Sequence, residues 1–139
     1  MIRILLANLV PAVFLAGIAS YLQFVQLPLL REGNDFRGYV ESHRLRNTLL
    51  MALPMTVEIA AAAFLWWNSK DAISLVLLAL AGAILLITFL GIAPGFHRLT
   101  KGYDRATVSR LLLCNGFRTA GWTVRSVILL WIVARSVRI

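Results

Sequence analysis

Four long runs of apolar residues alternate with short polar segments along the chain. The runs cover residues 4–30, 49–67, 72–93 and 111–134. Each is close to or above the ~20 residues that an α-helix needs to cross ~30 Å of hydrocarbon. Lipid offers no hydrogen-bond partners to the backbone, so runs of this kind must be helical. The pattern predicts an integral membrane protein with four transmembrane helices.

Polar and helix-breaking residues indicate where these helices begin and end. Asp35 is suited to cap the second helix, because it follows Gly33 and Asn34 and precedes a helical stripe of mostly apolar residues. Only residues 68–71 separate the second run from the third, which predicts a tight antiparallel turn. We therefore predict one all-α domain over residues 1–139, an up-down four-helix bundle with helices at about 4–30, 35–67, 72–95 and 105–135.

Composition supports the membrane class. Hydrophobic residues make up 60% of the chain and charged residues 14%, whereas a soluble domain is about one quarter charged. The net charge of +8 does not indicate nucleic acid, because the basic residues border the apolar runs and so resemble topology signals and contacts with anionic lipid. The single cysteine, Cys114, follows three leucines and is interpreted as a buried, inert thiol.

The basic residues also predict an orientation. Eight lie in the two longer connections and four on the opposite side. The eight are Arg31, Arg37, Arg44, Arg46, Arg98, Lys101, Arg105 and Arg110. By the positive-inside rule, both longer connections are cytoplasmic and both termini lie on the non-cytoplasmic side of a bacterial-type inner membrane. Capture of an anionic substrate is the alternative role for the basic residues of the connection between the third and fourth helices.

The fourth run carries polar residues in its apolar part. Asn115, Arg118, Trp122 and Arg125 share one helical face over three turns. An arginine at the centre of a membrane helix costs at least ~2.5–3.5 kcal/mol on insertion scales, so this face cannot meet lipid. It must meet partners inside the protein, a wet cavity or a ligand.

Counting residues inward from the tight turn gives each polar residue a depth. Glu58 and Arg125 both lie about nine residues from the same predicted interface, or ~13 Å deep at ~1.5 Å per residue. This predicts a Glu58–Arg125 ion pair near mid-membrane, because each charge alone would be costly there. The pair either fixes the register of the helices or belongs to a functional site.

The same count brings the two histidines, His43 and His97, to one level at the cytoplasmic interface. Tyr21, Gln23, Gln26 and Asn47 lie at or slightly below that level. Tyr21, Gln26 and Asn47 are candidate substrate-binding residues, together with Trp122. We predict a pocket open toward the cytoplasm, with Glu58 and Arg125 at its floor. Three roles are open for the two histidines. They are interfacial side chains hydrogen-bonded to backbone or water, or ligands of a metal or haem, or acid–base groups.

Several short motifs carry a resemblance to a known group. Their residues are Pro28, Leu29, Phe36, Tyr39 and His43, then Pro54, Met55 and Glu58, then Pro94, His97, Gly102 and Asp104, and finally Asn115, Arg118, Thr119, Trp122 and Arg125. The chain resembles a widespread group of small bacterial four-helix membrane proteins of unknown function, loosely similar to the anthrone-oxygenase-like family. The resemblance implies oxidation of a polycyclic aromatic without an obvious cofactor.

Two hypotheses of function follow. In the first, the chain is an oxidoreductase or oxygenase-like enzyme acting on a lipophilic substrate within the bundle. Arg118 and Asn115 would polarise a carbonyl or oxyanion, and His43 or His97 would act as acid–base groups or metal ligands. In the second, it is a non-enzymatic subunit of a larger membrane complex or homo-oligomer. The first predicts a cavity or a bound group at these residues, and the second a dry, fully paired interior.

Overall fold

The computed structural model describes residues 1–32 and 36–137, with the side chains of all of these except residues 36 and 43–45. The predicted cap Asp35 and the side chain of His43 therefore lie outside the described residues.

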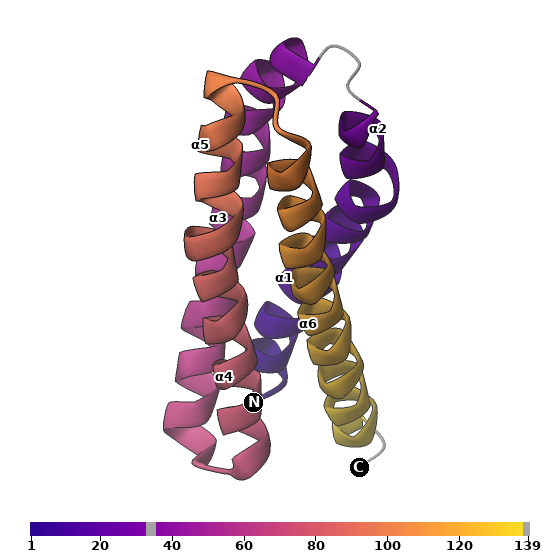
Figure 1. Cartoon of the computed structure of the whole chain (residues 1–139). Coiled ribbons are helices and arrows are strands. Elements are labelled where there is room, and N and C mark those ends of the chain that lie inside the picture. The colour runs from indigo at the N-terminus through magenta and orange to yellow at the C-terminus, as the bar shows by residue number, and fades with distance from the viewer. Residues whose placement is uncertain (33–35, 138–139) are drawn as a thin grey trace.

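Within the described residues, eight helical segments combine into four long helices. The first consists of α1 (Ile2–Tyr21), η1 (Leu22–Gln26) and α2 (Leu27–Arg31), and the second of α3 (Phe36–Ser69) alone. The third consists of α4 (Ala72–Ile87), η2 (Thr88–Ile92) and α5 (Ala93–Lys101), and the fourth of α6 (Arg105–Val137). Successive long helices run in opposite directions (Figure 1), which confirms the predicted all-α, up-down four-helix bundle. The third helix extends six residues past its predicted end at residue 95.

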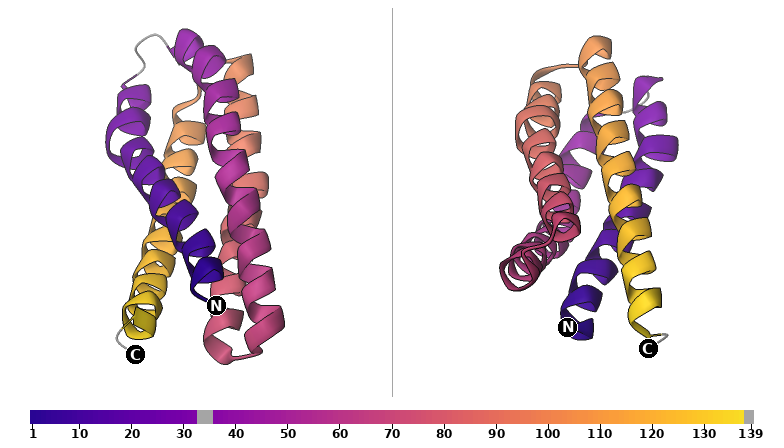
Figure 2. Two further views of the ribbon diagram at one scale, coloured as in Figure 1. Left: turned by 180° about the vertical axis from the view of Figure 1, so that it is seen from behind. Right: turned by 90° about the horizontal axis from the view of Figure 1, so that it is seen from below.

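The two ends of the bundle differ in what they hold. Both chain termini and the turn from α3 to α4 lie at one end, which we call the termini end (Figure 1). The connections from α2 to α3 and from α5 to α6 lie at the opposite end, the loop end. Figure 2 shows the same arrangement from behind and from below. Within the bundle, α1 packs against α3 and α6, and α4 packs against the same two helices, so that the four form a ring.

All four long helices are long and apolar enough to cross a membrane, over Ile2–Arg31, Arg37–Ser69, Ala72–Lys101 and Arg105–Val137. Their outward faces carry large apolar side chains, and Val10, Phe24, Leu53, Trp67 and Leu90 are each more than 60% exposed. An outer surface of this kind is compatible with direct contact with lipid.

The turn between α3 and α4 is short because two residues complete it. Lys70 has φ 52°, a left-handed conformation that reverses the chain, and its ammonium lies 4.0 Å from the centre of the Trp66 ring. Asp71 caps α4 by accepting a 2.7 Å hydrogen bond from the backbone N–H of Ser74. That hydrogen bond, helped by the hydroxyls of Ser69 and Ser74, holds the pKa of Asp71 below its usual range.

Three apolar clusters fill the interior from one end to the other. The cluster at the loop end is Leu27, Leu30, Val40, Ile92, Leu99, Val108 and Leu111. The middle cluster is Leu15, Ala19, Leu22, Met51, Ile84 and Trp122. The cluster at the termini end is Leu5, Leu9, Ala12, Leu65, Leu77 and Leu129. Buried polar side chains lie among the residues of the middle cluster and of the cluster at the termini end. These polar side chains form the candidate site.

Candidate functional site

The interior face of α6 is polar over three turns. Asn115, Arg118, Trp122 and Arg125 are each at most 3% exposed, so the shared face predicted from their spacing lies inside the bundle. Their polar contacts fall into two groups, the Arg125 layer toward the termini end and the Arg118 layer toward the loop end.

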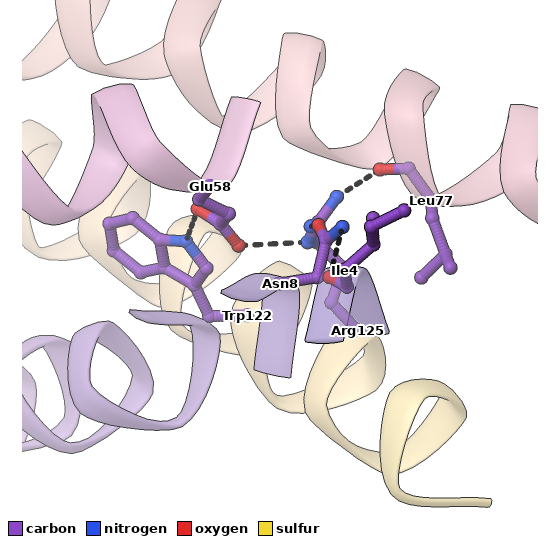
Figure 3. Close-up of polar contacts among 6 residues, drawn as sticks. All are labelled: Ile4, Asn8, Glu58, Leu77, Trp122 and Arg125. Atoms are coloured by element: carbon purple, nitrogen blue, oxygen red, sulfur yellow. Dashed lines mark hydrogen bonds and ion pairs between the residues drawn. The ribbon is translucent and has the colours of Figure 1, made fainter. Parts of the chain in front are cut away.

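The Arg125 layer is a closed network (Figure 3). Arg125 Nε lies 2.9 Å from Glu58 Oε1, and Trp122 Nε1 donates a 2.9 Å hydrogen bond to the other carboxylate oxygen, Oε2. Arg125 Nη2 donates to Asn8 Oδ1 at 3.1 Å, and Nη1 donates to the backbone carbonyl of Leu77. Residues of α1, α3, α4 and α6 therefore meet at one guanidinium.

This network compensates both buried charges. Glu58 is 3% exposed and Arg125 is fully buried, so either charge alone would carry a large desolvation cost. One carboxylate oxygen accepts a hydrogen bond from Trp122, and the other lies 2.9 Å from Arg125 Nε as an ion-pair contact without a hydrogen bond. The other two nitrogens of the guanidinium donate to Asn8 and Leu77. The structure thus brings together Glu58 and Arg125, and the geometry fits a lock on the register of the four helices.

Asn8 in this network was not singled out from the sequence. It is fully buried on α1, where its Nδ2 also donates to the carbonyl of Ile4 at 3.5 Å. The available signal was a single amide in an otherwise apolar run, which needs a partner in lipid. Counting residues along the first helix could have placed Asn8 near the level of Arg125, since both lie near the termini end.

The Arg118 layer is built differently. Arg118 Nη2 donates to Asn115 Oδ1 at 3.0 Å and also lies 3.7 Å from the thioether sulfur of Met51. Nη1 makes a long contact of 3.4 Å with the hydroxyl of Thr88. The guanidinium carbon lies 5.1 Å from the centre of the Trp122 ring, which places the cation over an aromatic face.

Asn115 is fully engaged in holding this arrangement. Its Nδ2 donates to the carbonyl of Ala19 at 3.0 Å and to Gln23 Oε1 at 2.9 Å, while its Oδ1 accepts from Arg118. An asparagine side chain has two donor hydrogens and one carbonyl oxygen, so little capacity is left for a ligand. In this geometry Asn115 positions Arg118.

Among the described residues, Arg118 is a buried cation without an anion beside it. It is 3% exposed, yet no described carboxylate lies within ion-pair distance of its guanidinium, and its Nε has no acceptor in the same part of the chain. Its other partners include a thioether, which is a weak acceptor, and a hydroxyl at the long distance of 3.4 Å. A guanidinium in this state can bind a carboxylate, a phenolate or a carbonyl oxygen with charge-assisted hydrogen bonds.

Two π-helical turns flank the Arg118 layer. Gln23, which accepts from Asn115, lies in η1, and Thr88 is the first residue of η2. Each π turn ends two residues before a proline, Pro28 or Pro94. Proline lacks an N–H and its ring clashes with the carbonyl four residues earlier, which a wider turn relieves. Turns of this kind occur frequently at functional sites.

These π turns were not predicted from the sequence. Pro28 and Pro94 were a partial signal, because Pro11 and Pro54 also lie within helices and have no π turn beside them. A proline within a helix therefore does not by itself predict a π turn from a single sequence.

The other candidate residues lie outside this interior face. His97 is exposed on α5, nine residues after Thr88 and so about 13 Å further toward the loop end. Tyr21 is 53% exposed on the outer surface of α1. Gln26 is half-buried and accepts a 2.7 Å hydrogen bond from the hydroxyl of Tyr39. Asn47 is half-buried on α3.

The predicted metal or haem site at His43 and His97 stays a prediction, because the side chain of His43 lies outside the described residues. Within the described part of the chain, no group of three or more His, Cys, Asp or Glu side chains gathers around a common point.

The fold and the interior together define a class, an integral membrane four-helix bundle with two buried arginine layers. No family model matches the chain, and no match is found among curated proteins or solved structures.

Proposed function

We propose that the protein binds a lipophilic molecule through a carbonyl or anionic oxygen at Arg118. The observation that carries this proposal is the buried guanidinium, which has no described carboxylate beside it and no described acceptor at its Nε. A charge of this kind is costly in a membrane, and intramembrane ionisable residues commonly mark functional sites. An oxygen atom of a ligand would supply the missing acceptor.

The surroundings of Arg118 suit a hydrophobic ligand. Met51 is a flexible side chain that can move aside, and the 3.7 Å contact between its sulfur and Arg118 is weak. Trp122 offers an aromatic face beside the cation. The layer lies in the middle apolar cluster, so a ligand would enter from lipid and be held by its apolar body.

As an enzyme, the protein would act on the bound molecule in the way that the resemblance implies, as an oxidoreductase or oxygenase-like protein. Arg118 would stabilise negative charge developing on the carbonyl oxygen, and Asn115 would hold Arg118 in place. His97 lies about 13 Å from the level of Thr88 along its helix, so it would act at the rim. The proposal places this rim on the cytoplasmic side of the inner membrane.

The fluorescence of Trp122 tests binding directly. The variant Trp66→Phe/Trp67→Phe/Trp131→Phe keeps Trp122 as its one tryptophan, 5.1 Å from the Arg118 guanidinium. We expect anthraquinone-2-carboxylate, which carries carbonyl and carboxylate oxygens on a polycyclic body, to quench this fluorescence saturably. Adding Arg118→Met should weaken the apparent affinity at least about tenfold, because hydrogen bonds to charged groups are worth ~1.5–3 kcal/mol.

Arg135→Met is the matched control in the same background, because Arg135 stacks 4.0 Å from the Trp131 position at the termini end, away from Trp122. Equal quenching of the parent protein, the Arg118→Met variant and the Arg135→Met variant would contradict the proposal.

A specific observation favours a second candidate, a non-enzymatic subunit of a larger membrane complex. The two charges of the Arg125 layer compensate each other as an ion pair, which fits a purely structural role. In addition, an apolar groove of about 420 Å³ opens between α4 and α6 at the termini end, lined by Ala72, Ile73, Val76, Val127, Ile128 and Trp131. We rank binding above the subunit role because Arg118 carries a buried charge without a described carboxylate beside it. A residue that only fixed the register of the helices would need no uncompensated charge.

A further inference from the structure

A small cavity lies between the third and fourth long helices at the loop end, where α5 and α6 run side by side (Figure 1). Its volume is about 50 Å³, which is room for a group of a few heavy atoms, since a single water needs ~10–15 Å³ on a comparable measure. Two arginines and a threonine, Arg98, Arg110 and Thr107, line it together with apolar residues. We call it the Arg98–Arg110 slot.

Two glycines bring the walls of the slot together. A Cβ atom built at Gly95 would lie 2.6 Å from Leu111 Cδ2, and one built at Gly91 would lie 2.8 Å from Cys114 Sγ. Only glycine therefore allows η2 and α5 to approach α6 this closely without displacing those side chains. Arg98 on α5 and Arg110 on α6 both line the cavity that lies between these helices.

The charge around the slot is predominantly positive. Neither Arg98 nor Arg110 forms an ion pair with a carboxylate in the described ranges. Asp104 is the nearby acid, and it is committed to capping α6 through the N–H groups of Ala106 at 3.1 Å and Thr107 at 3.2 Å. The Thr107 hydroxyl also donates to this carboxylate and is the main reason why the pKa of Asp104 lies below its usual value, with Arg98 a minor cause.

The level of the slot matches that of lipid headgroups. Arg110 and Trp131 lie on the same helix about 20 residues apart, or about 30 Å, which is the thickness of the hydrocarbon core. Tryptophans mark membrane interfaces, so if Trp131 lies at one interface, Arg110 lies at the other. Arg98 lies on α5 in the third long helix and lines the same cavity as Arg110, so it reaches the same level of the bundle.

An apolar track leads from the slot toward the bilayer centre. Leu113 and Phe117 follow Arg110 at positions i+3 and i+7, so they share its helical face, and each is 62% exposed. Leu90, which lines the slot from η2, is 71% exposed. A molecule with a small anionic head and a long apolar tail would contact both parts.

We propose that the Arg98–Arg110 slot binds a phosphate group, and that the headgroup of an anionic phospholipid supplies it. Arginine binds phosphate bidentately, and two arginines that line one cavity from neighbouring helices can both bind a single phosphodiester. The acyl chains would lie along Leu90, Leu113 and Phe117. This site is separate from the one proposed at Arg118, which lies two turns further along α6 in the buried interior.

Native mass spectrometry of the detergent-purified full chain tests the proposal. Phosphatidylglycerol would be titrated into delipidated wild-type protein, into Arg98→Gln/Arg110→Gln, and into Arg3→Gln/Arg135→Gln as a control that loses the same charge at the termini end. We expect the slot variant to bind the first phosphatidylglycerol about tenfold more weakly or worse, and the control to stay within about twofold of wild type.

Inorganic phosphate at millimolar concentration separates the two sources of the phosphate group. If it leaves slot-dependent phosphatidylglycerol binding unchanged, the ligand is the lipid; if it displaces the lipid from wild-type protein, the slot takes free phosphate as well. Equal affinity of all three proteins for phosphatidylglycerol, or an equal loss in both variants, would overturn the proposal.

Discussion

Replacing Arg125 with leucine is expected to lower the free energy of unfolding by about 3–5 kcal/mol, the usual cost of removing one partner from a buried ion pair. The change leaves the Glu58 carboxylate, which is 3% exposed, with the Trp122 N–H as its remaining described partner. Asn8 Oδ1 and the Leu77 carbonyl lose the hydrogen bonds from Arg125 as well. Reversible unfolding of the purified protein in mixed micelles, followed by circular dichroism, measures this loss.

A double-mutant cycle isolates the pair itself. Glu58→Gln should also destabilise the protein, because it leaves the Arg125 guanidinium without its counter-ion, while the amide oxygen of the substituted side chain can still accept from Trp122. The double variant Glu58→Gln/Arg125→Leu should be more stable than the sum of the two losses predicts, by about 1–3 kcal/mol. Losses that add to within about 0.5 kcal/mol would mean that the two charges do not stabilise one another.

Replacing Arg118 with methionine is not expected to lower the free energy of unfolding. This arginine has no described carboxylate to leave behind, so the variant removes an uncompensated buried charge and keeps most of the side-chain length. The gain is reduced because Asn115 Oδ1 loses its donor. For ligand-free protein we expect the free energy of unfolding to stay the same or to rise by up to about 2 kcal/mol.

The same unfolding assay checks this prediction beside Arg125→Leu. A loss at Arg118 as large as that at Arg125 would show that both layers are structural, and would favour the subunit over the binding protein. A stable Arg118→Met variant would fit the general pattern that a functional site is maintained at a cost in stability.

The four helices and the interior face of α6 could be predicted because they depend on the length of the apolar runs and on the spacing of residues along a helix. Apolar runs of ~20 residues marked the four helices, and the spacing of Asn115, Arg118, Trp122 and Arg125 marked the interior face of α6. Counting at ~1.5 Å per residue brought Glu58 level with Arg125, and the structure joins them at 2.9 Å.

The rest of the site depends on rotation and packing. Counting gives the level of a residue along its helix but not the side on which it lies, which is why His97 was assigned to a pocket and is exposed on α5. For the same reason Tyr21, chosen by its level, lies on the outer surface. The level of Gln23 was predicted, but its hydrogen bond with Asn115 was not. That bond and the contacts of Asn8 and Thr88 follow from how four helices pack.

The most direct test of the binding site at Arg118 is to identify what the protein carries. Wild-type protein and the Arg118→Met variant, purified from membranes in the same detergent, would be extracted with organic solvent and compared by mass spectrometry, with Arg135→Met as the control. We predict about one equivalent of a lipophilic compound with a carbonyl or acidic oxygen in the wild-type and control extracts, reduced at least about tenfold in the Arg118→Met extract. Identical extracts from all three proteins would contradict a binding site at Arg118.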